Sequence, residues 1–557
     1  MPEWLSVGLQ HHEAGRLAEA ESAYRRVLAA DSQNVDALHF LGVIAYQRGE
    51  HAQAEELISR ALLRNTSNAP AHNNLGNALD AQGRLDEAMD CYQRALDLQP
   101  GYADALFNLG AALRAKGELE SAVACYRKAL SVAPDASMAH STLGSALAQQ
   151  GKLGEAADCL RRAIALNPRN AQAHSNLGNV LRHQDRLDEA VDSLRTALAL
   201  RPDLAEAHGN LALTLVALGR PRQAEENFLR ALELRPESAE LKFGLSLLRL
   251  LLGDYASGLA LYERRLDKDA LPQATYAALQ ARIAQLQGAA RWQGEDGAGR
   301  VLLVWTDQGL GDTLMMMRYF PLLKGRGFRR LVVHCEDAVL RIVKSIPGVD
   351  EVVSRREPTP IGRFDCHCPL TSLPLAFKTR VETIPGGVPY FAVPQELQRK
   401  WSARLAGVAR PRVGLVWAGR KDYPKDALRS IRLEQLAPLF AISGINFVNL
   451  QKGDEARQIG QSGLKLIDRM DECGDLMETA ALMQALDLIV AVDTAVMHLA
   501  GALGKPVWLV NRFETEWRWM LEREDSPWYP TMRIFRQHRP NDWSQVMAQV
   551  AAALQSF

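Results

Sequence analysis

The chain has 557 residues, and its 65 Lys and Arg balance its 65 Asp and Glu, so the formal charge is zero. This balance excludes bulk electrostatic binding to nucleic acid or to an anionic membrane, which needs a basic excess. No apolar run is long enough for a membrane span, and the opening stretch MPEWLSVGLQHHEAG is amphipathic helix rather than a secretory signal. We therefore expect a cytoplasmic protein.

A period of 34 residues runs through the first half of the chain. It combines a Leu followed by a small residue, a later Gly, an Ala and a closing Pro. The recurring leucines are Leu41, Leu75, Leu109, Leu143, Leu177, Leu211 and Leu245. Small residues let two helices approach closely, a left-handed Gly ends the first helix, and Pro begins the next one. The period predicts stacked pairs of helices.

This pattern resembles the tetratricopeptide repeat over residues 1–238, and a degenerate eighth unit over 239–272 looks like an end cap. The resemblance implies an α-solenoid, a right-handed superhelix whose concave face is lined by the first helix of each pair. We expect this array to occupy residues 1–272.

Several first helices carry asparagine at the same repeat position. These residues are Asn74, Asn108, Asn176 and Asn210. A carboxamide both donates and accepts hydrogen bonds, so a row of them suits the backbone of an extended segment of an acceptor protein. The alternative, that asparagine is ordinary repeat consensus, stays open at this stage.

The period ends near Pro272, and the pattern then changes to α/β. A polar helix is expected over 273–287 and a Gly-rich acidic hinge over 294–299, which makes 273–299 a linker. Short apolar runs then alternate with helical patterns, which is typical of parallel α/β units. Predicted strands lie at 301–306, 331–336 and 350–353, and then at 413–419, 445–451, 464–468, 488–492 and 506–510, with a loop and short helix over 364–377. We expect two doubly wound sheets, in lobes 300–395 and 396–557, with a ligand cleft between them.

Two strand-to-helix turns carry recognisable motifs, GLGDT from Gly309 to Thr313 and DTAVMHLAGALGKP from Asp493 to Pro506. Together they resemble the two anchors of bacterial heptosyltransferases, which are glycosyltransferases with two Rossmann-like domains (the GT-B fold). The second motif departs from that family at Ala495, where Gly is usual. Repeats followed by such a half also resemble the O-linked N-acetylglucosamine transferases and the bacterial flagellin glycosyltransferases, which modify proteins.

Asp312 is the candidate general base, because it follows a strand end and matches the Asp that serves as base in heptosyltransferases. Asp307 is the second candidate for this role. The alternative for Asp312 is a carboxylate that merely caps its helix.

The turn at Asp493 and Thr494 is the candidate cradle for the donor diphosphate, because a helix N-terminus presents unpaired N–H groups and a positive dipole end. His498, one turn into the helix, is expected to reach a phosphate or the sugar, although a lone helical His is more often structural. Arg429 stands where heptosyltransferases carry a phosphate-binding Lys, and Lys452 resembles the segment that meets the nucleobase and ribose. The full expected donor-binding set is Gly309, Gly311, Lys425, Arg429, Lys452, Asp493, Thr494 and His498. A solvated charge run remains the alternative for Lys425 and Arg429.

No metal site is expected. Cys366, His367 and Cys368 are adjacent, so on an extended segment they point to opposite faces, and no second pair follows at zinc-finger spacing. Nothing in the sequence resembles the Asp-x-Asp metal site of the other large glycosyltransferase fold, so metal-independent chemistry is implied and no cofactor is expected. The aromatic cluster Trp517, Trp519, Trp528 and Tyr529 is interpreted as pinning the C-terminal helix.

We thus expect a metal-independent glycosyltransferase that moves a sugar from a nucleotide-sugar to a protein hydroxyl, with the repeats holding the acceptor. The family resemblance implies that the transfer inverts the anomeric carbon. One alternative is a transferase acting on a lipid-linked or free saccharide. The other is a non-catalytic repeat scaffold for protein–protein interaction. No residue indicates which nucleotide or sugar is used, or whether a homo-oligomer forms.

Overall fold

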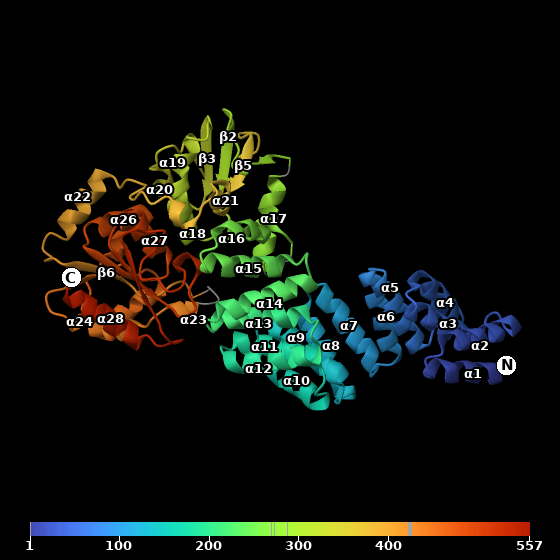
Figure 1. Cartoon of the computed structure of the whole chain (residues 1–557). Coiled ribbons are helices and arrows are strands. Elements are labelled where there is room, and N and C mark those ends of the chain that lie inside the picture. The colour runs from blue at the N-terminus through green and yellow to red at the C-terminus, as the bar shows by residue number, and fades with distance from the viewer. Residues whose placement is uncertain (1, 269, 272, 287, 422–425) are drawn as a thin grey trace. The chain divides into compact units, whose positions relative to one another are not determined.

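A computed structural model describes residues 2–268, 270–271, 273–286, 288–421 and 426–557. The chain forms two compact units, Met1–Thr214 and Leu215–Phe557, and the division falls within helix α13 (Ala205–Ala217) (Figure 1). Within the described part of the chain, no helix combines the length and the apolar character that a membrane crossing requires.

The first unit is a succession of helix pairs. The helices are α1 (Pro2–Glu13), α2 (Leu17–Ala30), α3 (Val35–Gln47), α4 (His51–Arg64), α5 (Ala69–Ala81), α6 (Leu85–Leu98), α7 (Ala103–Ala115), α8 (Leu119–Val132), α9 (Ser137–Gln149), α10 (Leu153–Leu166), α11 (Ala171–His183) and α12 (Leu187–Leu200). This arrangement confirms the helical array that the 34-residue period predicts.

The repeated glycines have the two roles expected of them. The mid-repeat Gly83 has a φ of 77°, in the left-handed region, and Asp185, which replaces Gly in one repeat, keeps a φ of 61°. In the first helix, a Cβ at Gly76 would lie 2.5 Å from Cε1 of Tyr92. Glycine there lets the second helix of the pair pack against the first.

In the second unit, helices α14 (Pro221–Leu234), α15 (Ala239–Leu251) and α16 (Tyr255–Tyr262) are followed by the 3-10 turn η1 (Glu263–Leu266). Leu250, Tyr255 and Tyr262 belong to the same buried core as the α/β elements. The degenerate last repeat is therefore built into the α/β half.

The first sheet is parallel and has the strand order β1-β5-β2-β3-β4. Its strands are β1 (Ala290–Arg291), β2 (Val301–Trp305), β3 (Arg330–Cys335), β4 (Glu351–Ser354) and β5 (Cys366–Pro369). Around it lie α17 (Gln273–Gln285), α18 (Leu310–Met316), α19 (Phe320–Lys324), α20 (Leu340–Lys344) and α21 (Leu373–Ala376), and we call this sheet with α18–α21 the first lobe.

The prediction of a loop at the start of 364–377 is wrong, because β5 lies there, between β1 and β2. All four of its residues are buried, since both of its neighbours and the covering helices surround it.

The second sheet is also parallel, with the order β10-β9-β8-β6-β7. Its strands are β6 (Arg412–Val416), β7 (Asn446–Asn449), β8 (Leu488–Val492), β9 (Val507–Asn511) and β10 (Met532–Arg536). With helices α22 (Gln395–Arg404), α23 (Asp426–Arg429), α24 (Ala437–Phe440), α25 (Gln458–Ser462), α26 (Leu476–Gln484), α27 (Ala495–Ala502) and α28 (Ser544–Gln555), it forms the second lobe.

Two expectations for this sheet change. Segment 464–468 makes only an isolated bridge, between Val448 and Ile467, and β10 was not predicted. The apolar run at 464–468 instead packs partly buried beside the sheet.

The aromatic cluster near the end of the chain does not pin the C-terminal helix, as the sequence suggested. Trp517 packs on Tyr255 and Tyr262 of the last repeat, with ring centroids 6.0 and 6.2 Å apart, and Trp528 donates from Nε1 to the Tyr255 hydroxyl at 3.0 Å. Helix α28 uses a different core, centred on Val546 and Val550. The cluster therefore joins the second lobe to α16.

Candidate active site

Two strand-to-helix turns meet between the lobes of the second unit. One follows β2 and opens α18, and the other follows β8 and opens α27. The helices pack so closely that a Cβ at Gly311 would lie 2.8 Å from Cδ2 of His498. The two sequence motifs are therefore neighbours in space, and Gly311 is required by this approach.

Asp312, in the first turn of α18, faces the second lobe. Its Oδ1 accepts from Nη2 of Arg518, which lies in the 3-10 turn η9 (Trp517–Trp519). Both side chains are largely withdrawn from water, at 15% and 14% exposure. Burial opposes the charged form of Arg518, but Asp312 and then Glu516 outweigh it and raise the pKa of the guanidinium above its ordinary value. This ion pair bridges the two lobes.

Asp493 orients the second turn. Its Oδ2 accepts from Nε1 of Trp519 at 2.8 Å, and its backbone carbonyl accepts from Nη1 of Arg429 at 3.0 Å. Burial raises the pKa of the Asp493 carboxyl, and the charge of Glu516 adds to the rise.

Thr494 stands at the N-cap of α27 with extended backbone, at φ −143° and ψ 167°, and its side chain does not cap the helix. Its Oγ1 is buried and has no hydrogen-bond partner among the described residues. A buried unpaired hydroxyl is costly, and here it lies beside the unsatisfied N–H groups of a helix start. The arrangement suits an incoming anion.

His498 is enclosed by protein groups. Its Nδ1 lies 2.9 Å from the Tyr529 hydroxyl, and its Nε2 lies 3.8 Å from Oδ1 of Asp493. Burial lowers the pKa of His498 well below its ordinary value, and the charge of Arg518 lowers it further, so the ring is neutral at physiological pH. These contacts tie α27 to its surroundings, and direct donor contact by His498 stays a prediction.

The remaining predicted donor residues lie on neighbouring loops of the second lobe. Arg429 pairs with Asp426 at 3.0 Å and, through Asp493, joins the turn before α27. Lys452 follows β7, and its Nζ donates to the backbone carbonyl of Cys473. Lys425 lies outside the described residues. Gly309, the N-cap of α18, has φ −72°, a conformation open to any residue.

Comparison with known proteins bears on both halves of the chain. The model of glycosyltransferase family 9 (heptosyltransferase) matches residues 465–551, a stretch that contains Asp493, Thr494 and Arg518. A tetratricopeptide repeat model matches residues 11–79, and the model of the cilia and flagella-associated protein 70 C-terminal domain matches 64–301. The chain is thus similar to tetratricopeptide repeats in its first half and to glycosyltransferase family 9 near its end.

Similar individual proteins cover only part of this chain. Protein FlbA of Caulobacter vibrioides is 29% identical over 332 residues, which are 55% of this chain and 54% of FlbA, so the chain spans about half the length of this curated relative. YrrB, a solved TPR protein with an unusual peptide-binding site, is 25% identical, covers 32% of this chain and 93% of its own, and has a TM-score of 0.29. A thermophilic TPR protein of Thermus thermophilus is 28% identical, with coverages of 35% and 100% and a TM-score of 0.29.

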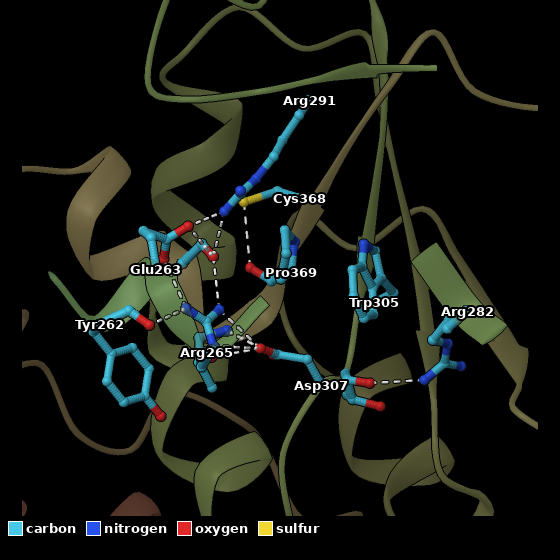
Figure 2. Close-up of polar contacts among 12 residues, drawn as sticks. Tyr262, Glu263, Arg265, Arg282, Arg291, Trp305, Asp307, Cys368 and Pro369 are labelled. Carbon is cyan, nitrogen blue, oxygen red and sulfur yellow. Dashed lines mark hydrogen bonds and ion pairs between the residues drawn. The ribbon is translucent and has the colours of Figure 1, made fainter. Parts of the chain in front are cut away.

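Asp307, the second candidate base, has a different environment from Asp312. Figure 2 shows it beside Arg265 of η1, with which it forms an ion pair at 2.8 Å, and both side chains are fully buried. It also accepts from the backbone N–H and the hydroxyl of Thr371, at 3.0 and 2.6 Å. Both oxygens of Asp307 accept from protein donors, whereas among the described residues only Oδ1 of Asp312 does, so Asp312 stays the prediction for proton transfer.

The four asparagines of the repeats form hydrogen bonds within the array. Asn108 donates to Asn73 at 3.0 Å and to Asn77 at 2.9 Å, and Asn74 lies 2.9 Å from the His39 ring. Asn176 accepts from Gln172 at 3.1 Å, and the backbone carbonyl of Asn210 accepts from Thr214. All four residues are half-buried, so capture of a partner stays a prediction.

Cys366, His367 and Cys368 lie on β5, and the described residues contain no cluster of three His, Cys, Asp or Glu that could hold a metal. His367 accepts from Nε1 of Trp305 at 3.2 Å, and burial lowers the pKa of its ring to about 4. These side chains belong to the core of the first sheet.

Sequence reasoning missed Arg518 and Trp519, which contact both motif turns. The available signal was position, because the segment Glu516–Trp519 follows the end of β9, at the same edge of the sheet as Asp493. Its aromatic residues were interpreted only as packing, and the charged residue between them was overlooked.

Proposed function

We propose that the chain is a glycosyltransferase of the GT-B type that moves a sugar from a nucleotide-sugar to a hydroxyl of an acceptor protein. The observation that carries this proposal is the meeting of α18 and α27, where Asp312 of one lobe lies across from the Thr494 turn of the other. Two parallel five-stranded sheets support the fold type. The match to glycosyltransferase family 9 supports the reaction class.

The proposed chemistry is a single displacement without a metal. The acceptor oxygen attacks the anomeric carbon while the bond from that carbon to the diphosphate oxygen breaks, so the configuration inverts. Asp312 takes the hydroxyl proton, and the nucleoside diphosphate leaves with the bonding electron pair.

The second lobe contributes donors for the charge that develops on the leaving group. The α27 N-terminus offers backbone N–H groups and the hydroxyl of Thr494, which no described residue pairs, and Arg429 is fixed to this turn through the Asp493 carbonyl. Preorganised donors of this kind stabilise a transition state more than a ground state, because they need no reorganisation.

The repeat array is proposed to hold the acceptor protein, in the manner of the flagellin-modifying enzymes that the architecture resembles. The asparagines of the first helices would hydrogen-bond to its backbone. Replacement of Asn108, Asn176 and Asn210 by Ala is expected to weaken acceptor capture while the array stays folded. Unchanged capture by this triple variant would remove these residues from the binding site.

The decisive experiment incubates the full chain with a candidate acceptor protein and a panel of nucleotide-sugars, and weighs the intact acceptor. A gain of one sugar mass that depends on Asp312 supports the proposal. Transfer only to a free or lipid-linked saccharide would favour the first alternative. Binding of the acceptor with no transfer, and no nucleotide binding in a panel of UDP, GDP, ADP and CMP, would favour the scaffold.

A further inference from the structure

Arg518 contacts the candidate base, but the proposed chemistry gives it no role. Its guanidinium contacts carboxylates of both lobes, since Nη2 donates to Asp312 and Nη1 lies 3.4 Å from Glu516. Its Cζ also lies 5.1 Å from the centroid of the Trp517 ring. The third donor, Nε, is buried and has no hydrogen-bond partner among the described residues.

On one edge of the guanidinium, Nη2 is therefore paired and Nε has no described partner. Nε and Nη2 point to the same side of the planar group and together form a two-pronged donor that fits two oxygens of a phosphate. Asp312 occupies only Nη2 of that edge, whereas Glu516 lies at Nη1. An anion with two suitably spaced oxygens would fill both prongs, and a single carboxylate oxygen does not.

The turn that carries Arg518 is fixed next to the candidate diphosphate cradle. Trp519, the next residue, donates to Asp493, and Asp493 directly precedes Thr494. Glu516 is in turn held by Arg512, whose Nη2 lies 2.8 Å from its Oε1. The residues on both sides of Arg518 are therefore fixed, and they place its guanidinium near the N-terminus of α27. A phosphate bound there would meet this guanidinium if it replaced Asp312 on the Nε–Nη2 edge.

A buried ion pair of this kind is poor evidence for stability, because desolvation of the two charges offsets much of their attraction. Its position across the lobes, on the candidate base itself, gives it a different significance. While Nη2 holds Oδ1 of Asp312, the carboxylate is held toward Arg518 and Oδ1 is not open to an acceptor hydroxyl.

We propose that the Asp312–Arg518 pair is a latch, and that the donor diphosphate opens it by taking the Nε–Nη2 edge of Arg518. Asp312 is then released toward the acceptor hydroxyl, so the donor must bind before the base can act. This inference rests on the proposed function, and it assigns Arg518 to diphosphate binding. When the nucleoside diphosphate leaves, Arg518 returns to Asp312 and closes the latch.

The latch makes a prediction that concerns binding alone. In the wild-type chain a diphosphate must displace Asp312 from Arg518, so removing the carboxylate charge removes a competitor. Asp312→Asn is therefore expected to bind a nucleoside diphosphate about tenfold more tightly, and Arg518→Gln about tenfold more weakly. In the Arg518→Gln background, Asp312→Asn should give no further gain, because the two changes act on one interaction.

The experiment is isothermal titration calorimetry of the full chain with UDP, GDP, ADP and CDP, followed by the two single variants and the double variant with whichever ligand binds. Arg518→Lys retains one positive charge and is a second variant in case the Gln variant does not fold. In the Lys background, Asp312→Asn should still tighten binding. The matched control is Arg341→Gln, which removes another ion pair between the lobes, Arg341 to Asp475 at 2.7 Å, and should leave affinity unchanged.

The outcomes separate the two proposals. If a nucleoside diphosphate binds but Asp312→Asn binds it no more tightly than wild type, the latch is overturned and the proposed function stands. The latch is likewise overturned if the gain persists undiminished in the Arg518→Gln background. If only CMP binds the wild-type chain, the latch is overturned because it needs a diphosphate, and the proposed function stands. If neither CMP nor any of the four nucleoside diphosphates binds, the proposed function itself fails, and the latch fails with it.

Discussion

The turn after β2 and the turn after β8 have the same design, a buried parallel strand leading into a helix, yet they differ in how their polar groups are paired. In the first turn both carboxylates are held by arginines from elsewhere, Asp307 by Arg265 and Asp312 by Arg518. In the second, Asp493 accepts from the neutral indole of Trp519, and the hydroxyl of Thr494 has no partner in the part of the chain that the structure describes. The same backbone geometry thus presents ion-paired carboxylates in one lobe and hydrogen-bond donors without described partners in the other.

The largest expected effect tests whether the first turn supplies the base. Asp312→Asn keeps the size of the side chain but removes its proton affinity, so turnover should fall by about a thousandfold. Intact-mass measurement of the acceptor over time reads this loss. Asp337→Asn, at an exposed carboxylate of the same lobe, should keep wild-type turnover. Retained activity in Asp312→Asn would assign the base elsewhere.

The other carboxylate of the same turn should affect stability rather than chemistry. Asp307→Asn leaves the fully buried Arg265 without its closest charge partner in that lobe, and the free energy of unfolding should fall by about 3 kcal/mol. Glu263, 2.8 Å from Arg265, keeps the loss at the lower end of the range for broken buried pairs. Urea denaturation measures it.

The control for Asp307 is an exposed pair on the same lobe. Arg356→Gln removes the partner of Asp337, and it should change the unfolding free energy by less than about 1 kcal/mol. Equal losses in Asp307→Asn and Arg356→Gln would contradict the difference in burial on which the contrast depends.

The second turn should behave in the opposite way. Thr494→Val removes a buried hydroxyl that has no partner in the described structure, so the free protein should be as stable as wild type or more stable. Affinity for the nucleoside diphosphate should nevertheless fall about tenfold, the value of one hydrogen bond to a charged group. Calorimetry and thermal melting of the same samples give both quantities.

Thr479→Val is the matched control for Thr494→Val. The hydroxyl of Thr479 donates to the Asp475 carbonyl at 3.0 Å within α26, so its loss should lower stability and leave affinity unchanged. If Thr494→Val instead loses stability and keeps affinity, the hydroxyl serves the fold and not the ligand.

The smallest effect concerns His498, whose pKa is lowered in the folded protein. In the unfolded chain the pKa of this ring is about 6.5, so below that pH the unfolded ring binds a proton whereas the folded ring stays neutral. The free energy of unfolding therefore falls as the pH falls through that value. His498→Gln should remove up to about 1.4 kcal/mol per pH unit from this slope between pH 5 and 6.5. An unchanged slope of unfolding free energy against pH would show that the buried ring does not contribute it.

The repeats were the most predictable part of the chain, because each position in the 34-residue period recurs for a local reason. Gly76 leaves room for the Tyr92 ring. Asp185, which replaces the mid-repeat glycine in one repeat, keeps the left-handed conformation. The sheet was less predictable. Strand β5 reads CHCP, and neither its length nor its composition distinguishes it from a loop until β1 and β2 flank it.

The site was predictable only where a motif stays within one turn. Asp312 and Thr494 follow strands and open helices, and that placement can be inferred from the chain locally. The partners that distinguish the two turns come from far away, since Arg518 lies 206 residues from Asp312 and Arg265 lies 42 residues from Asp307. No spacing rule connects these residues, because their contact exists only once the lobes and the last repeat have packed.

The incorporation of α16 into the core of the α/β half has a consequence for how such proteins diversify. Tyr255 and Tyr262 pack on Trp517, so the last helix pair is a fixed part of the α/β half. We expect that upstream repeats can be lengthened, shortened or exchanged without rebuilding the α/β half, provided that the last helix pair is kept. A chimera that joins a foreign array in the turn before α13 keeps the last helix pairs whole and should fold, whereas one that joins it at residue 272 lacks α16 and should expose Trp517.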